Sequence, residues 1–261
     1  MSSPLAFTWL GHSTFLLRSP GGKRILVDPF VNANPSCPES AKKIDALDLI
    51  LITHGHSDHT ADAVSMARAT GAHVIANYEI CLWLESKGIQ NTAPMGQGGT
   101  LTIGGLSITM VNAVHGSSVV DDGALVYLGQ AGGYVIRFED GLTIYFAGDT
   151  DLFPGMAELA PVDVALLPVW GWGPSLGSGH LDPARAALAV GLLRADLAVP
   201  IHWGTLWPFG FGRIRPGRLA NPPLEFARRV AATQPDCTVL VTPPGERVAR
   251  PNRDRRGRPQ K

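Results

Sequence analysis

This chain of 261 residues has only three cysteines, no long apolar run and a formal net charge of zero at pH 7. Its three cysteines, Cys37, Cys81 and Cys237, are widely spaced and form no Cys-x-x-Cys pair, which argues against a disulfide framework. No run approaches the roughly 18 apolar residues of a membrane-spanning helix, and the N-terminus lacks the basic and apolar regions of a signal peptide. We therefore expect no membrane span and a cytoplasmic location.

The formal net charge is zero, but the charge is unevenly distributed. Residues 247–261 hold seven of the 22 Lys and Arg residues and one of the 22 acidic residues, so residues 1–246 carry a net charge of −6. This composition predicts a folded domain over residues 1–246, followed by a disordered basic tail over 247–261. An acidic body also argues against a nucleic-acid partner, which would require a broad basic face.

The 45% hydrophobic content suffices for one large domain of alternating strands and helices in two similar halves. Two sheets packed face to face, with helices outside, would bury these elements. We expect strands at 6–10, 14–18, 24–28, 49–53, 73–76, 106–114, 134–138, 142–146, 163–168, 197–201 and 238–242. Helices are expected at 60–69, 79–87, 183–193 and 223–233.

A dense group of metal-ligating residue types follows the expected strand at 49–53. The segment Thr53-His54-Gly55-His56-Ser57-Asp58-His59 places three imidazoles and a carboxylate within six residues. In extended backbone the side chains of His54 and His56 point to the same side and can bind one ion. Asp58 and His59 fall where the next helix begins. The turn between the strand and this helix redirects the chain, so both side chains can bind a second ion close to the first.

Further candidate ligands come at the ends of other expected strands. His115 follows 106–114, Asp149 follows 142–146 within Gly148-Asp149-Thr150, and His202 follows 197–201. Sites on open sheets collect at strand ends, so this recurrence predicts one shared metal centre, in which the Asp149 carboxylate can bridge two cations.

Together these motifs resemble the metallo-β-lactamase superfamily of metal-dependent hydrolases, over about Trp9 to Trp207. The segments Trp9–Phe15 and Ile25–Pro29 are similar to the ascorbate-6-phosphate lactonase branch, whereas His180–Ala187 and Ile201–Thr205 are closer to the N-acyl phosphatidylethanolamine phospholipase D branch. The resemblance implies an αββα sandwich. At His180-Leu181 the chain departs from the Thr-Met pair of the lactonase branch, which weakens transfer of a lactonase substrate.

The resemblance also implies how the ligands are divided. One ion would be held by His54, His56 and His115, and the other by Asp58, His59 and His202, with Asp149 between them. Two divalent cations about 3.5–4 Å apart would lower the pKa of a bridging water toward about 7, so that hydroxide attacks a lactone, carboxylic ester or phosphodiester. Zinc suits these ligands, and manganese and iron accept the same set.

Other residues are candidates for roles beside the ions. Asp58 can orient the nucleophile, and His180 can supply the leaving-group proton or contact the substrate, or else be a hydrogen-bonded loop residue. His12 is expected beside the ligands, in a supporting or purely structural role. Asp28 can accept the outer N–H of a ligand histidine.

Two loops are candidates for substrate recognition. Trp172 lies in an aromatic segment before His180, and Arg213 and Arg215 follow a second aromatic segment after His202. They predict a partly apolar pocket for a small, anionic substrate, although a solvent-facing basic loop has the same composition. The Trp-containing loops would also suit a homo-oligomer. The alternative function is a metal-binding redox or sensor module without hydrolytic turnover. The first motif argues against a diiron redox site of the flavodiiron kind, for which the resemblance implies a Glu at the position of His56.

Overall fold

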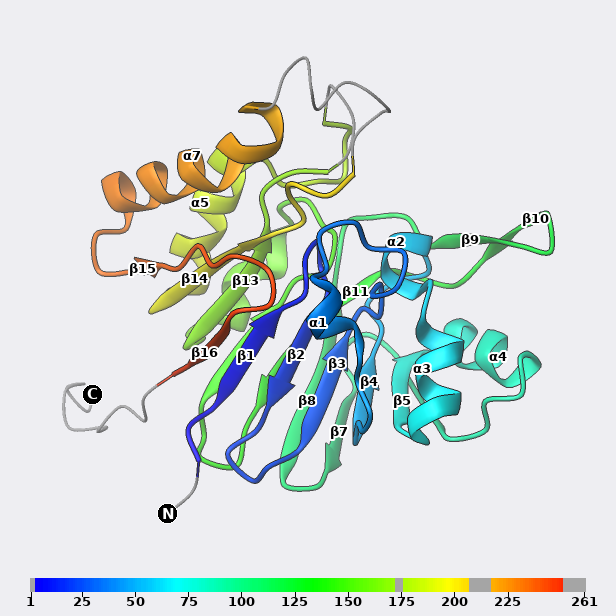
Figure 1. Ribbon diagram of the computed structural model, residues 1–261. Helices are drawn as coiled ribbons and strands as arrows, with labels where there is room; N and C mark the ends of the chain where they lie inside the picture. Colours follow the sequence, from blue (N-terminus) through cyan, green and yellow to red (C-terminus); the bar gives the residue numbers. More distant parts are fainter. Residues whose placement is uncertain (1–2, 172–175, 207–216, 251–261) are drawn as a thin grey trace.

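In the computed structural model, which describes residues 3–171, 176–206 and 217–250, two seven-stranded sheets lie face to face (Figure 1). The first sheet has the order β16 (Arg247–Ala249), β1 (Ala6–Trp9), β2 (Phe15–Arg18), β3 (Arg24–Val27), β4 (Leu49–Leu51), β5 (His73–Asn77) and β6 (Thr92–Met95). The second has the order β15 (Thr238–Val239), β14 (Leu197–Ile201), β13 (Val164–Pro168), β12 (Thr143–Phe146), β11 (Gly132–Arg137), β8 (Leu106–Asn112) and β7 (Thr100–Ile103).

Both sheets combine an antiparallel half with a parallel half. Strands β1, β2 and β3 pair antiparallel, and β3 to β6 pair parallel. In the second sheet, β7, β8, β11 and β12 pair antiparallel, and β12 to β15 pair parallel. The two similar halves expected from the sequence therefore correspond to two sheets of related topology.

Helices cover the outer faces of the sheets. Over the first sheet lie α1 (Glu39–Lys42), α3 (Ala63–Thr70) and α4 (Tyr78–Ser86), and over the second lie η1 (Pro154–Leu159), α5 (Pro183–Leu193) and α7 (Gly217–Thr233) (Figure 1). The short helix α2 (Ser57–Thr60) follows β4, and a separate hairpin of β9 (Ser118–Asp121) and β10 (Ala124–Tyr127) projects from the body. This arrangement confirms the expected αββα sandwich.

The apolar runs of the central strands are explained by burial on both faces. Within β3, Ile25 and Val27 face the core between the sheets, whereas Leu26 faces the helices. In β13, Leu166 faces the other sheet and Leu167 faces the helix layer. A strand covered on both sides needs apolar residues at every position. The length of the apolar run therefore indicates where the strand ends.

Several element boundaries differ from the sequence prediction. The expected helix at 60–69 is divided into α2 and α3, so Asp58 and His59 lie inside a helix rather than before one. Helix α7 begins six residues earlier than the expected 223 and contains Pro222 and Pro223. The strand expected at 238–242 is limited to 238–239, and β6, β7, β9 and β10 were not predicted.

The C-terminal boundary expected at residue 247 is corrected by the structure. Arg247–Ala249 forms β16, which pairs antiparallel with β1, and the Arg250 side chain is buried. Main-chain pairing outweighs the local composition here, because β1 offers a free edge. Residues 251–261 lie outside the described residues, and within the described ones no helix is long and apolar enough to cross a membrane.

Candidate metal centre

The candidate ligands converge where strands of both sheets end. His54 follows β4, His115 follows β8, Asp149 follows β12 and His202 directly follows β14. Helix α2 adds Asp58 and His59 from the side of the first sheet. The seven side chains predicted as ligands thus lie close together in one region, and both halves of the fold contribute to it.

Three imidazoles form the first group. The Nδ1 atom of His56 lies 3.0 Å from Nε2 of His54 and 3.1 Å from Nε2 of His115. Two nitrogen ligands of a tetrahedral ion, each at about 2.0–2.1 Å from it, lie about 3.3 Å apart. The three nitrogens therefore face a common point at nearly the spacing that a shared cation requires.

Carboxylates and imidazoles form the second group. His202 Nε2 lies 3.0 Å from Asp149 Oδ2 and 3.6 Å from Asp58 Oδ2. His59 Nε2 lies 3.6 Å from Asp149 Oδ1 and 3.9 Å from Asp58 Oδ2. Asp149 Oδ2 is also 3.7 Å from Nε2 of His115 in the first group. Asp149 accordingly lies between the two groups, as a bridging ligand would.

Unpaired polar atoms in the described part of the site fit a divalent cation. His59 Nε2 and Asp149 Oδ1 are buried without a hydrogen-bond partner, and their separation of 3.6 Å exceeds hydrogen-bond length. Among the described residues, no Lys or Arg nitrogen lies within ion-pair distance of Asp58 or Asp149. Buried carboxylates of this kind require a cation or protonated partners, and the donor set suits the former.

The outer ring nitrogens of four histidines are held by hydrogen bonds. Nδ1 of His54 lies 3.0 Å from Thr53 Oγ1, and Nδ1 of His59 lies 2.8 Å from Asp28 Oδ2. Nδ1 of His115 and Nδ1 of His202 each lie 2.8 Å from a backbone carbonyl oxygen, that of Gly179 and that of Trp170 respectively. With Nδ1–H donating outward, the neutral form of each ring has an unprotonated Nε2 toward the centre, which is the arrangement that metal ligation needs.

The pKa values divide the histidines into two sets. Burial lowers the pKa of His115 to about 4 and that of His54 well below its ordinary value, so both rings are neutral. Burial also disfavours charged His59 and His202, but Asp149 outweighs it and raises the pKa of His202 to about 9, and Asp149, Asp28 and Asp58 raise that of His59 well above its ordinary value. A bound cation would take the place of these protons.

Two glycines allow the ligands to approach. Gly148 has φ +61°, and a Cβ atom there would lie 2.7 Å from the Cβ atom of Thr53. Gly55, between the two histidines of the motif, would place a Cβ atom 2.9 Å from Leu128. Both contacts are closer than side chains tolerate, so the strand ends can meet only with glycine at these positions.

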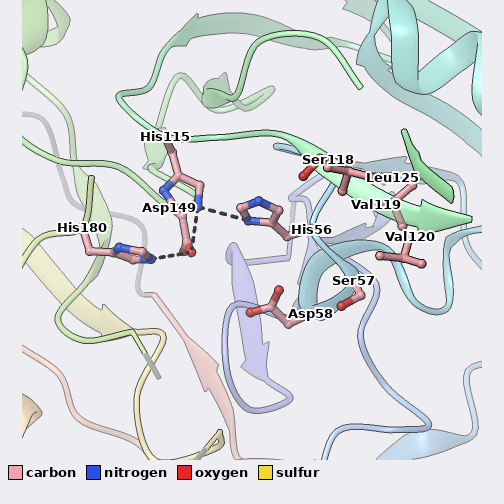
Figure 2. Close-up of a pocket in the computed structure, with 10 residues that line it drawn as sticks. All are labelled: His56, Ser57, Asp58, His115, Ser118, Val119, Val120, Leu125, Asp149 and His180. Carbon is pink, nitrogen blue, oxygen red and sulfur yellow. Dashed lines mark hydrogen bonds and ion pairs between the residues drawn. The ribbon is translucent and has the colours of Figure 1, made fainter. Parts of the chain in front are cut away.

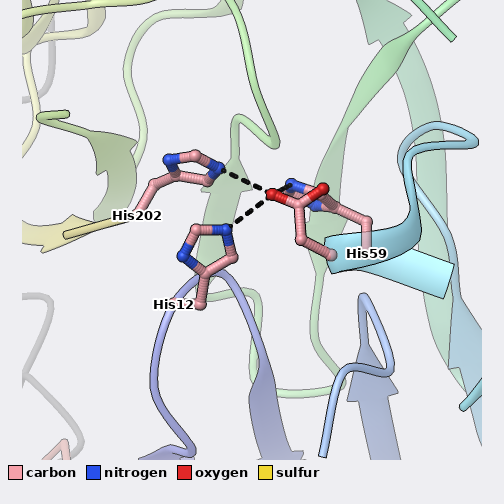
Figure 3. Close-up of side chains that lie close together, drawn as sticks. His12, His59 and His202 are labelled. Carbon is pink, nitrogen blue, oxygen red and sulfur yellow. Dashed lines mark hydrogen bonds and ion pairs between the residues drawn. The ribbon is translucent and has the colours of Figure 1, made fainter. Parts of the chain in front are cut away.

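The structure places His12 and Asp28 beside the ligands. His12, which is buried in the turn between β1 and β2, lies with Nε2 2.8 Å from Asp58 Oδ2 (Figure 3). Asp28 accepts hydrogen bonds from the Thr53 amide and hydroxyl in addition to its contact with His59. Both residues lie beside the candidate ligands, and their supporting roles stay a prediction; His12 is also close enough to join a group with Asp58, His59 and His202.

His180 faces the centre from the loop before α5. Its Nε2 lies 3.6 Å from Asp149 Oδ2, and its ring centroid is 4.6 Å from that of His115. A cavity of about 340 Å³ opens here; its described lining includes ligand candidates, His180 and part of the β9–β10 hairpin (Figure 2). His180 therefore lies between the candidate ligands and the space a substrate would enter.

Some residues were missed by the sequence prediction, and others cannot be placed. Trp172, Arg213 and Arg215 lie outside the described residues. Thr53 and Ser117 were not predicted, yet Thr53 contacts Asp28 and His54, and the Ser117 hydroxyl accepts a hydrogen bond from the Gly55 amide. The only signal for them was adjacency to ligand motifs, which does not distinguish a supporting hydroxyl from a solvated one.

Comparison with known proteins agrees with this geometry. Residues 23–203 match the family described as Beta-lactamase superfamily domain. A UPF0173 metal-dependent hydrolase of Rubrobacter xylanophilus is 43% identical over 245 residues, covering 92% of this chain and 95% of that protein. A metallo hydrolase of the archaeon Ignicoccus hospitalis aligns with a TM-score of 0.76 at 33% identity, covering 94% of this chain and 97% of that one. A metallo-beta-lactamase fold protein of Bacillus subtilis, 16% identical, aligns with a TM-score of 0.67 over 94% of this chain and 99% of that one, and shows the shared fold.

Proposed function

Because this chain belongs to the UPF0173 family of metal-dependent hydrolases, within the beta-lactamase superfamily, we propose that it hydrolyses a small ester-type bond at a centre of two divalent cations. The bond is a lactone, a carboxylic ester or a phosphodiester. The observation that carries the proposal is the position of Asp149, whose two oxygens face histidines of both ligand groups.

We assign one cation to His54, His56 and His115 and the other to Asp58, His59 and His202, with Asp149 shared. The assignment is supported by nitrogen spacings of 3.0 and 3.1 Å in the first group and by the unpartnered, buried His59 Nε2 in the second. Zinc suits imidazole and carboxylate ligands, and manganese and iron are the alternatives.

Cations held in this way supply an activated water at neutral pH and polarise the scissile carbonyl or phosphoryl group. The chain's own residues then position and move protons. Asp58 stays ionised, because His59, the hydrogen bond from His12 and the nearby His202 ring outweigh burial and hold the pKa of its carboxyl well below the ordinary range. An ionised carboxylate can orient the attacking water but cannot donate a proton.

The leaving group requires a proton donor, and we assign this role to His180. Its ring lines the cavity, and its Nε2 lies 3.6 Å from Asp149 Oδ2, on the same side as the candidate ligands. Imidazole is the side chain whose ordinary pKa best suits proton donation near neutral pH. His180 can also contact the substrate, and the two roles differ in whether its loss lowers kcat or raises KM.

We further propose that the substrate is a small anionic molecule and that the protein is located in the cytoplasm. We propose no nucleic-acid partner and no catalytic role for the basic residues after 250. The cavity of about 340 Å³ supports a small molecule. The three cysteines are free thiols, which supports a reducing compartment. A homo-oligomer stays a prediction from the Trp-containing loops.

The test combines metal analysis with a substrate panel. The purified protein is expected to contain two equivalents of divalent metal and to hydrolyse at least one of a lactone, carboxylic ester or phosphodiester series. Asp149→Ala should lose metal and turnover, whereas His73→Ala, which removes a histidine at the start of β5 away from the centre, should keep both. Iron without turnover on the panel would instead favour the redox or sensor function.

A further inference from the structure

The β9–β10 hairpin has two chemically different faces. Residues directly opposite in the hairpin share a face, and the face alternates from one pair to the next. The pair Val119 and Val126 therefore points one way, and the pair Val120 and Leu125 points the other. The sequence of the hairpin thus places an aliphatic pair on each side.

The face that carries Val119 and Val126 fixes the hairpin to the body. Both valines are partly buried against the core formed with α3 and α4. On the same face, Asp121 Oδ2 accepts a hydrogen bond of 3.0 Å from Trp83 Nε1 and lies 2.8 Å from Lys87 Nζ. Apolar contact and polar contacts together hold this face against α4, so the orientation of the other face is set.

The face that carries Val120 and Leu125 borders the cavity beside the candidate metal centre, and Val119 of the other face lines the same cavity. Val120 is 69% exposed and Leu125 is 75% exposed, although both line the cavity that also contains His56 and Asp149 (Figure 2). Figure 2 shows these two side chains on the opposite side of the cavity from His180, with His56 between. The cavity therefore has one side of metal-ligating groups and one side of exposed aliphatic groups.

We propose that Val120 and Leu125 determine substrate specificity by contacting an aliphatic group of the substrate beside its scissile bond. The inference rests on the proposed function and adds to it the chemical class of substrate: an ester-type compound with an alkyl or acyl substituent. The described lining of the cavity contains no Lys or Arg, so a substrate's negative charge would be bound at the cation side and its apolar part at the hairpin. Covering two exposed aliphatic side chains by such a group is favourable.

The test measures binding, so that it does not depend on turnover. Acetate, butyrate, hexanoate and octanoate are titrated by calorimetry into zinc-loaded wild-type protein and into Val120→Ser, Leu125→Ser and Leu125→Met. The matched control is Leu188→Ser, because Leu188 is an exposed leucine on α5, outside the cavity lining. In the wild type and the control, affinity should rise by about two- to fourfold per methylene, the upper value corresponding to full burial.

The increase in binding free energy per methylene should be at least halved in both Ser variants and retained in Leu125→Met. The affinity for acetate should be equal in all proteins. A wild type without chain-length dependence, or Ser variants that keep it, would overturn the inference. Sedimentation velocity adds a further outcome: if Leu125→Ser dissociates a dimer and leaves the dependence unchanged, the face binds a second copy instead. Failure of the whole ester panel would refute the proposed function while leaving this binding result intact.

Discussion

Replacing Asp28 by Asn is expected to weaken the cation site of His59 more than the other cation site. Asp28 is fully buried, and its carboxylate accepts hydrogen bonds from the Thr53 amide and hydroxyl and from His59 Nδ1, which lies 2.8 Å away. An Asn side chain can keep the contact with the amide through its oxygen. Its NH₂ group then faces the His59 ring, which can accept only by moving its own proton from Nδ1 to Nε2.

The size of the effect follows from this change of tautomer. A proton on Nε2 of His59 must be lost before that nitrogen can bind a cation. Loss of such a supporting partner typically reduces metal affinity by about 10- to 100-fold, which corresponds to about 1.4–2.7 kcal/mol. His54, His56 and His115 make no direct hydrogen bond to Asp28 in the described structure, and His54 is linked to it only through the Thr53 hydroxyl. The affinity of the first site should therefore change less than that of the second.

The assay is zinc competition against a chromophoric chelator, with metal content measured after dialysis. Wild-type protein and Asp48→Asn, a control carboxylate on the surface near Lys23, should retain both ions, whereas Asp28→Asn should show one site weakened more than the other. Urea unfolding of the metal-free proteins separates a loss of about 1–3 kcal/mol in fold stability from the metal effect. Equal weakening of both sites, or of neither, would refute the reasoning.

Three further perturbations are expected to act on the same centre. His12→Gln should lower the metal affinity of the cation site that includes Asp58 by about tenfold, because His12 Nε2 lies 2.8 Å from Asp58 Oδ2. Turnover at saturating metal should not change, and an unchanged zinc affinity would contradict the prediction. Removal of metal by chelation should lower Tm, because cation at 1,000 times its Kd stabilises the fold by about 4 kcal/mol, and a Tm independent of added zinc would argue against a structural contribution. Gly148→Ala should reduce the free energy of unfolding in urea by more than Gly22→Ala, since both have positive φ but only Gly148 lies against Thr53, at 2.7 Å; similar losses would show that the close contact is relieved without cost.

The positions of the candidate ligands could be predicted because they combine two sequence signals. An apolar run buried on both faces fixes where a strand ends, and a His or Asp directly after it is unusual in composition. His54, Asp149 and His202 each carry both signals, and the structure brings all three to one region. Only the resemblance to a family, however, indicated how the ligands are divided between two ions.

The hairpin and the C-terminal strand could not be predicted for physical reasons. Strands β9 and β10 have few buried positions, so their sequence lacks the alternation that a half-buried strand shows. Strand β16 is stabilised by pairing with β1, a partner almost the whole chain away in sequence, and its basic composition indicates a solvated tail. Long-range pairing of this kind leaves no local pattern.

Thr53 connects the two sheets at the metal centre. Its backbone carbonyl accepts a hydrogen bond from the Gly132 amide of the second sheet, while its own amide and hydroxyl bind Asp28 in the first. The same hydroxyl oxygen lies 3.0 Å from His54 Nδ1 and can accept its proton, because it donates its own to Asp28. The hydroxyl therefore links the His54 ring, a candidate ligand of one proposed cation, with the carboxylate that holds the ring of His59, a candidate ligand of the other. A displacement of either sheet relative to the other would move candidate ligands of both proposed cation sites together.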